Sequence, residues 1–406
     1  MPVVTLRQES PRQGHFYVPE FEIKIEGVGL PRDILRDVTQ VTYRDSITEI
    51  DSFELTVNNW DATTRTFKYV GAETAASLRG STPESQRYRL FEPCNKAVEL
   101  RMGYLGDLRV MLKGNFTTME PNFPSSGAPT LTVRGLNVLH QLRKKPYTYA
   151  WFDKRDSEIA ENLATLQDRG QKRLPLPVVT DPKAKHEEPR IPIVSQKNQH
   201  DIDFLFSRAR ERGYVVFVQE EDAKRGIPKR LYFGPSDGSE MPGLRDVTFR
   251  LEWGKSLIEL KPTLTTANQV KSVTVNGWNR NTRRPISAAV DLQDPKLTKN
   301  RDLYGLLNQC DPREEIVVDE PVFTEGEARR RAMAILMDRQ KEMVKATAST
   351  VGLPDLRAGQ RVQIDGLGTR FSGTYFILDT THTLNDSGYL TRFTARREDG
   401  GQGSAA

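Results

Sequence analysis

Polar and apolar residues alternate along short segments near both ends of the chain. This period of two is typical of strands that bury one face and expose the other. Turn-forming residues, mainly Gly, Asn and Ser, follow these segments. The segments span residues 21–25, 38–43, 53–57, 361–364 and 390–394. The pattern predicts antiparallel β-structure at both ends of the sequence.

The same order of features occurs around residues 97–134 and again around residues 361–396. Each copy has an alternating strand, a Gly-rich turn, a Gly-x-aromatic triplet, a Ser-Gly turn and a Leu-Thr strand. The corresponding pieces are Val98-Glu99-Leu100 and Arg361-Val362-Gln363-Ile364, Gly114-Asn115-Phe116 and Gly373-Thr374-Tyr375, Ser126-Gly127 and Ser387-Gly388, and Leu131-Thr132 and Leu390-Thr391. This long spacing predicts a duplicated β-module and not a short-period solenoid. The first copy has a longer hairpin, with residues 108–112 extra, and chance similarity is the alternative explanation.

Helical periodicity appears in the middle of the chain. Ser157 can cap a helix with an apolar face, and Asp201 can cap a second helix that ends at Gly213. The two apolar faces are Ile159, Leu163 and Leu166, and Ile202, Leu205, Phe206 and Ala209. Residues 214–218 and 231–233 are predicted to be paired strands. Residues 168–195 are rich in proline and charge and are predicted to be a connector.

A return to β-structure is predicted at residues 270–275, with residues 287–290 as the returning strand. Thr324 and Glu327 have the spacing of a capping box and open a helix over residues 324–343. Gly352-Leu353-Pro354 then leads into the last β-module.

These elements divide the chain into four parts. We expect a first β-barrel module in residues 1–150 with a loop insertion at 61–95. A middle α+β domain follows in residues 151–255, and a second β-barrel module with the helix 324–343 occupies residues 256–397. The Gly- and Ser-rich residues 398–406 are predicted to be a disordered tail.

Length and composition narrow the possible classes of protein. A chain of 406 residues is long enough for two or three domains, and its net charge of +5 comes from 59 basic and 54 acidic residues. This balance is typical of a mixed, solvated surface and argues against a specific nucleic-acid partner. Cys94 and Cys310 have no metal or disulfide-framework spacing and are predicted to be free thiols, although they could pair. We expect no signal peptide and no membrane anchor, and synthesis in the bacterial cytoplasm.

Two short segments match parts of catalytic motifs in sequence, but the residues around them do not fit those motifs. The run from Gly234 to Gly238 spells G-x-S-x-G, but the residues after Ser236 do not favour the helix that a nucleophile elbow requires. Gly254-Lys255-Ser256 lacks the first glycine of a phosphate loop, since Phe249 stands there. The histidines have no zinc-helix spacing, and His382 is predicted to be structural or on the surface. They are His15, His140, His186, His200 and His382. We therefore predict no catalytic, cofactor-binding or metal-binding residues and no cofactor.

Several segments in a fixed order resemble one protein family. These are residues 21–25 with 50–58, residues 196–214 with Asp201 and Arg208, residues 329–336 followed by 352–362, and the hairpin 372–393. The chain resembles the late control D family of baseplate hub proteins from contractile phage tails and phage-like injection systems, which also forms the hub part of type VI secretion spikes.

The resemblance implies a mainly β fold with an α+β insert. In that family two tube-protein-like antiparallel β-barrels share one chain, and three chains form a pseudo-sixfold ring. The implied function is a structural baseplate hub that adapts a sixfold inner tube to a threefold spike. The implied partners are two further copies of the chain, a spike protein on a separate chain, an inner-tube or tube-initiator protein and other baseplate components. The alternatives are a particle-associated cell-wall hydrolase and a receptor-binding β-protein.

Overall fold

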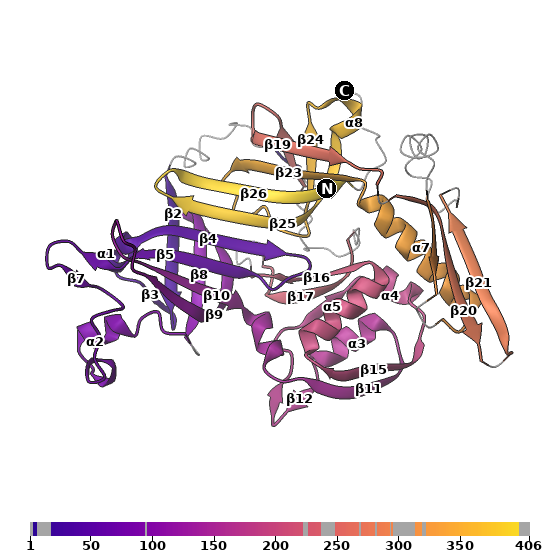
Figure 1. Cartoon of the computed structure of the whole chain (residues 1–406), viewed down its shortest axis with the longest axis horizontal. Coiled ribbons are helices and arrows are strands. Elements are labelled where there is room, and N and C mark those ends of the chain that lie inside the picture. The colour runs from indigo at the N-terminus through magenta and orange to yellow at the C-terminus, as the bar shows by residue number, and fades with distance from the viewer. Residues whose placement is uncertain are drawn as a thin grey trace.

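The computed structural model describes residues 3–5, 18–93, 96–221, 226–236, 248–267, 269–280, 282–292, 294, 313–318 and 322–397. The predictions for Cys94, Cys310, His15 and the tail 398–406 lie outside these residues. In the described part, 14 strands form one large, mainly antiparallel sheet, with a smaller α+β region beside it (Figure 1). The fold is mainly β, as the alternating pattern predicted.

The first module contains six main strands and the short β3 (Val28–Gly29). They are β2 (Pro19–Ile25), β4 (Val38–Ser46), β5 (Ser52–Asn58), β8 (Ala97–Tyr104), β9 (Asp107–Asn122) and β10 (Thr130–Asn137). Their order in the sheet is β2-β8-β9-β10-β5-β4, with all neighbours antiparallel. Alternate residues such as Leu55 and Val57 fill one apolar core, since side chains along a strand point to opposite faces.

The second module also contains six main strands. They are β18 (Thr248–Glu252), β19 (Leu257–Leu264), β23 (Val344–Val351), β24 (Arg361–Asp365), β25 (Gly373–Asn385) and β26 (Gly388–Arg397). Their order is β18-β24-β25-β26-β23-β19. The short β1 (Val3–Thr5) pairs with β18, and α8 (Gly368–Phe371) connects β24 to β25. β18, β19 and β23 lie in segments where the sequence pattern predicted no strand, because charged residues and Pro262 interrupt the alternation.

The two modules have the same strand order along the chain and across the sheet. The six main strands of one module occupy the same places in the sheet as the six of the other. Only the direction of the first strand differs, because β2 is antiparallel to β8 whereas β18 is parallel to β24. Two β-bulges also match. Thr117 and Leu378 are skipped in the β9–β10 and β25–β26 ladders, and Thr39 and Ile258 are skipped in the β4–β5 and β19–β23 ladders. Bulges alter strand geometry at defined positions, so their coincidence supports a duplicated module.

The ladder registers correct part of the sequence alignment. The two strands that were matched do correspond, and their ladders align Val98 and Leu100 with Val362 and Ile364. Leu131, however, corresponds to Thr391 and not to Leu390, because the matched bulges align Thr118–Arg134 with Asp379–Thr394. The predicted match was one residue out of register and would have placed the exposed Leu390 on the buried face. The Gly-x-aromatic triplets are two residues out of register, since Gly114 matches Tyr375.

The strand pairing does not show the closed barrels that were expected. Among the described residues no ladder joins β2 or β3 back to β4; instead β4 pairs with β25 and continues into the second module. Even so, Ile23 of β2 and Tyr43 of β4 belong to one apolar cluster, so the sheet curls around its core.

The region from residue 138 to 236 has its own core beneath the junction of the modules in Figure 1. It contains η2 (Val138–Arg143), β11 (Tyr147–Lys154), α3 (Asp156–Leu163), β12 (Gln167–Asp168), β13 (Gln171–Lys172), β14 (Val178–Thr180), α4 (Pro182–Glu187), β15 (Ile191–Gln199), α5 (Asp201–Arg212), β16 (Tyr214–Gln219) and β17 (Arg230–Pro235). The predicted strand pair β16–β17 and the left-handed Gly213 at the end of α5 are confirmed. The predicted caps were one or two residues late, since His200 and Arg155 hold the cap positions. The predicted connector 168–195 was wrong in part, because it contains β14 and α4.

Two insertions extend from the modules. In the first, the described residues 61–93 are largely loop, as predicted, but include the short strand β7 (Thr66–Phe67), η1 (Ser77–Arg79) and α2 (Pro83–Tyr88). The short strand β6 (Trp60–Asp61) leads into this insertion, and the short helix α1 (Arg32–Asp37) lies earlier in the module. In the second, α7 (Glu325–Lys341) packs on the sheet of β20 (Val270–Asn279), β21 (Arg284–Asp291) and β22 (Arg313–Val317). The predicted capping box of Thr324 and Glu327 is confirmed.

Candidate functional site at the junction of the two modules

The described residues contain no cluster of three or more His, Cys, Asp or Glu side chains that could hold a metal ion. His140, His186 and His200 lie in η2, in α4 and before α5. Gly234 lies in β17 and Ser236 follows that strand, but Asp237, Gly238 and the residues up to 247, where a nucleophile elbow would need its helix, lie outside the described residues. Gly254 forms a turn with φ +79° between β18 and β19, where no helix follows. The match at Gly254 therefore lacks the helix that follows a phosphate loop.

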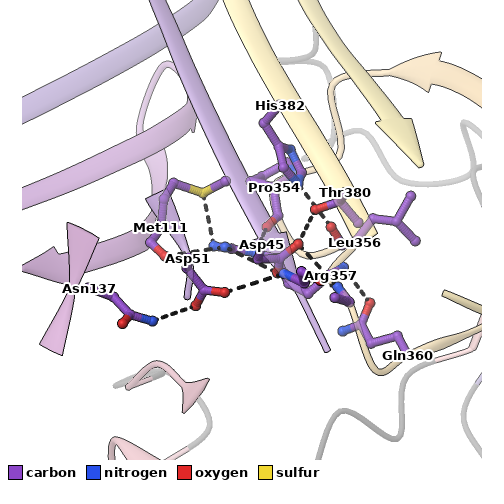
Figure 2. Close-up of polar contacts among 12 residues, drawn as sticks. Asp45, Asp51, Met111, Asn137, Pro354, Leu356, Arg357, Gln360, Thr380 and His382 are labelled. Atoms are coloured by element: carbon purple, nitrogen blue, oxygen red, sulfur yellow. Dashed lines mark hydrogen bonds and ion pairs between the residues drawn. The ribbon is translucent and has the colours of Figure 1, made fainter. Parts of the chain in front are cut away.

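The feature that does bring distant residues together is the junction between the modules. β4 of the first module and β25 of the second pair antiparallel from Gln40–Asn385 to Ser46–Asp379. Around this ladder, buried polar residues of β4, β25 and the 352–360 segment form one network with backbone oxygens of β9 (Figure 2).

Arg357 is the cation of this network and is buried. Its Nη1 donates to Met111 O at 3.2 Å, and its Nη2 donates to Val110 O at 3.0 Å. Met111 is the bulged residue of the β8–β9 ladder, and a bulge leaves backbone groups outside the ladder. Nε of Arg357 donates to Pro354 O at 2.8 Å, and its guanidinium lies 4.7 Å from the centre of the Tyr43 ring. A side chain of the second module thus binds the backbone of the first.

Asp45 of β4 is the acidic counterpart and is 2% exposed. Its carboxylate accepts the backbone N–H of Ala358 at 3.2 Å and the hydroxyl of Thr380, and lies 4.0 Å from Arg357 Nη1. A buried carboxylate needs such donors and a nearby cation to offset the loss of hydration. The neighbouring Asp379 lies in the same buried region, and burial raises its pKa.

His382 of β25 is fully buried beside this pair. Its Nε2 lies 3.0 Å from Leu356 O, which can only accept, so Nε2 carries the proton. Its Nδ1 then accepts from Tyr389 Oη at 3.0 Å or Thr391 Oγ1 at 3.1 Å. Burial, and to a lesser extent the charge of Arg357, hold the pKa of His382 well below its usual value. The histidine is therefore neutral and structural, one of the two roles predicted for it.

The middle region meets both modules at the same place. Phe217 and Tyr232 pack with Ile47 and Phe376 in one apolar cluster. Gly359, with φ +81°, passes so close to Phe217 that a Cβ would lie 2.7 Å from the ring. Only glycine fits this position without strain.

The junction is suited to holding the two modules and the middle region in fixed positions. Its buried polar groups supply the hydrogen-bond donors and acceptors that such a structural role needs. Sequence reasoning did not find Arg357 and Asp45 as partners. They are 312 residues apart, and no local pattern identifies an ion pair at that separation.

Comparison with solved structures identifies the fold. The 43 kDa tail protein of prophage MuSo2 from Shewanella oneidensis is similar with a TM-score of 0.63 and 14% identity, over 93% of this chain and 98% of that chain. A tail protein from Neisseria meningitidis has a TM-score of 0.62 and 14% identity, over 95% and 98%. A type VI secretion system component from E. coli, described as structurally similar to the T4 tail proteins gp27 and gp5, has a TM-score of 0.56 and 15% identity, over 93% and 77%. Comparison with curated proteins gives no match.

The fold is therefore that of the phage tail and baseplate proteins, as the resemblance implied. The chain belongs to the family described as the Alg8 N-terminal domain, whose model matches residues 17–386. Among the described residues, no helix has the length and hydropathy needed to cross a membrane.

Proposed function

We propose that this protein is the structural hub of a contractile phage tail or a related injection particle. Three copies form a ring in which six similar modules face a sixfold inner tube, while the ring as a whole presents true threefold symmetry to a spike. Matching cyclic symmetry lets every subunit of a partner ring make the same contacts. The observation that carries the proposal is the repeated strand order with its two matched bulges.

The junction supplies the stiffness that this role needs. Arg357, Asp45 and His382 join the modules through buried polar contacts, so the two modules of one chain act as two rigid sectors of a ring. The proposed partners are a spike protein on a separate chain, an inner-tube or tube-initiator protein and other baseplate components. We propose no enzymatic activity, and a peptidoglycan-clearing assay should show none.

Native mass measurement of the purified chain tests the proposal directly. The expected mass is three times that of the 46.1 kDa subunit. A monomer at every concentration, in the presence and absence of tube and spike proteins, would overturn the hub assignment.

A further inference from the structure

The internal duplication identifies a second pair of strand edges equivalent to the β4–β25 junction. The matched bulges align β4 with β19 and β25 with β9. Tyr43 and His382, which lie opposite each other in the junction, then correspond to Pro262 and Pro121. In the described residues β19 pairs only with β23, and the part of β9 beyond Thr117 pairs only with β10. These two open edges are therefore the places where a neighbouring copy of the chain could add a strand.

We propose that β19 of one subunit pairs antiparallel with the outer part of β9 in the next subunit. The occupant of each edge is a second copy of this chain, and the register repeats that of β4 and β25. The opposed residues are Thr118–Thr265, Met119–Leu264, Glu120–Thr263, Pro121–Pro262, Asn122–Lys261 and Phe123–Leu260. β19 and β9 lie on opposite sides of the β4–β25 junction (Figure 1), so the contact runs head to tail. The proposed trimer closes this contact after three copies. The inference rests on the proposed trimer.

The side chains on these edges support this occupant. In the junction, one face of the ladder is buried and carries polar residues such as Asp45, Thr380 and His382. The equivalent face of the two edges is apolar but only partly covered, and consists of Met119, Pro121, Phe123, Leu260, Pro262 and Leu264. Phe123 is 55% exposed. Pairing would cover these apolar groups, which is favourable.

The opposite face of the same edges is polar and exposed. It carries Glu120 and Asn122 on β9, and Lys261 and Thr263 on β19. In the proposed register Lys261 lies opposite Asn122 and diagonal to Glu120, within reach of an ion pair across the strands. Both faces therefore match in polarity in this register, and a one-residue slip would exchange them.

Pro121 and Pro262 lie opposite each other in the proposed register, at the centre of the ladder. Ile47 N–H donates to Leu378 O, which sets the alternation so that the backbone of Tyr43 and His382 faces the junction. The backbone nitrogens of Pro262 and Pro121 thus face the open edges and have no N–H to donate there. Proline is tolerated at such edge positions and discourages indiscriminate pairing. The ladder keeps hydrogen-bonded pairs at Met119–Leu264 and Phe123–Leu260, and apolar contact replaces the central one.

Cysteine cross-linking tests the register on the full chain. In a background with Cys94→Ser and Cys310→Ser, the double variant Asn122→Cys/Lys261→Cys places two thiols at a non-hydrogen-bonded pair, about 4.5 Å apart at Cα. Mild oxidation should give a covalent trimer on a non-reducing gel. The control Thr118→Cys/Lys261→Cys uses the same exposed face but lies four residues, roughly 13 Å, out of register and should stay uncross-linked.

The outcomes separate this inference from the proposed function. A trimer by native mass with no covalent trimer, or with equal cross-linking of the control, overturns the strand register and leaves the hub intact. Intramolecular disulfides, seen as oxidised monomers, also overturn it. Absence of any trimer for the parent chain overturns the proposed function itself, whatever the cysteines do.

Discussion

Arg357 of the second module donates through Nη1 to the backbone oxygen of Met111 in the first module, at 3.2 Å and across 246 residues of sequence. The acceptor is available because Met111 is a bulged residue outside the β8–β9 ladder. The β24–β25 ladder ends at Ile364–Gly373, one residue before the position that matches Met111, so the second module has no bulged ladder residue there. The duplication supplies the geometry of the sheet, and individual side chains fix how its two halves meet.

Replacing Arg357 should destabilise the whole chain. Arg357→Met leaves the oxygens of Val110, Met111 and Pro354 without their donor and leaves Asp45 buried without its nearby cation. Removing one partner from a buried charged contact typically costs about 3–5 kcal/mol. Urea unfolding should report this loss, and Arg357→Lys should give an intermediate loss because the charge remains but the guanidinium fork is lost.

Arg392 offers a matched control for that measurement, because it is an exposed arginine on β26. Arg392→Ala should change the free energy of unfolding by no more than about 0.5 kcal/mol. Equal effects at positions 357 and 392 would show that the buried network does not hold the modules together.

How much of this could be predicted from sequence is clearest at two pairs of residues. The strands that contain Val98 and Val362 were matched correctly, because both are short strands with clean alternation. Leu131 and Leu390 share a letter but not a face, and only the bulges at Thr117 and Leu378 reveal the slip. Identical letters carry little weight when a shift by one residue reverses the buried side.

The polar network of the junction could not be predicted in the same way. Helix caps and alternation are local signals, whereas Asp45, Arg357 and His382 meet only after both modules have folded. His382 looked like an ordinary hairpin residue, since nothing near it in sequence specifies burial. Local sequence signals therefore identified the two modules but not the contacts that join them.

The stability of the protein should fall on mild acidification because of His382. Burial holds its pKa in the folded state below the unfolded value of about 6.5. As pH falls below about 6.5, the unfolded chain binds this proton first, so the free energy of unfolding decreases by up to about 1.4 kcal/mol per pH unit. Urea unfolding between pH 5.5 and 7.5 measures this slope above the range in which most carboxylates titrate.

The variant His382→Gln is the control for that slope. Its amide can donate to Leu356 O but cannot titrate, so it should be less stable at pH 7.5 and show a flatter pH dependence. Asp379 acts in the opposite direction at lower pH, because its raised pKa makes the folded state bind a proton more readily. An unchanged slope in His382→Gln would rule out this histidine as the titrating group.

Gly359→Ala should destabilise the contact between the middle region and the junction. The new Cβ would lie 2.7 Å from the Phe217 ring, at a φ of +81° that L-residues rarely adopt. Backbone strain of about 1–2 kcal/mol and overpacking of about 1–3 kcal/mol should both contribute. Gly127→Ala has a similar φ of +92° but open space around it, and should show only the strain. Thermal unfolding of the two variants separates the terms, and equal losses would exclude the Phe217 contact.

Assembly should depend on Phe123, the exposed aromatic residue at the open edge of β9. In the proposed ring it lies opposite Leu260 of the next subunit, and covering its exposed half contributes about 1 kcal/mol per interface. Phe123→Asp removes this contribution and adds a charge that would have to be desolvated, so the trimer should dissociate at higher protein concentration than the parent. Sedimentation velocity over a concentration series measures the shift. Phe152→Asp is the matched control, because Phe152 is also exposed, at 63%, but lies on β11, away from both edges. It should leave the trimer unchanged, and a trimer that tolerates Phe123→Asp as well as Phe152→Asp would argue that this edge of β9 lies outside the subunit contact.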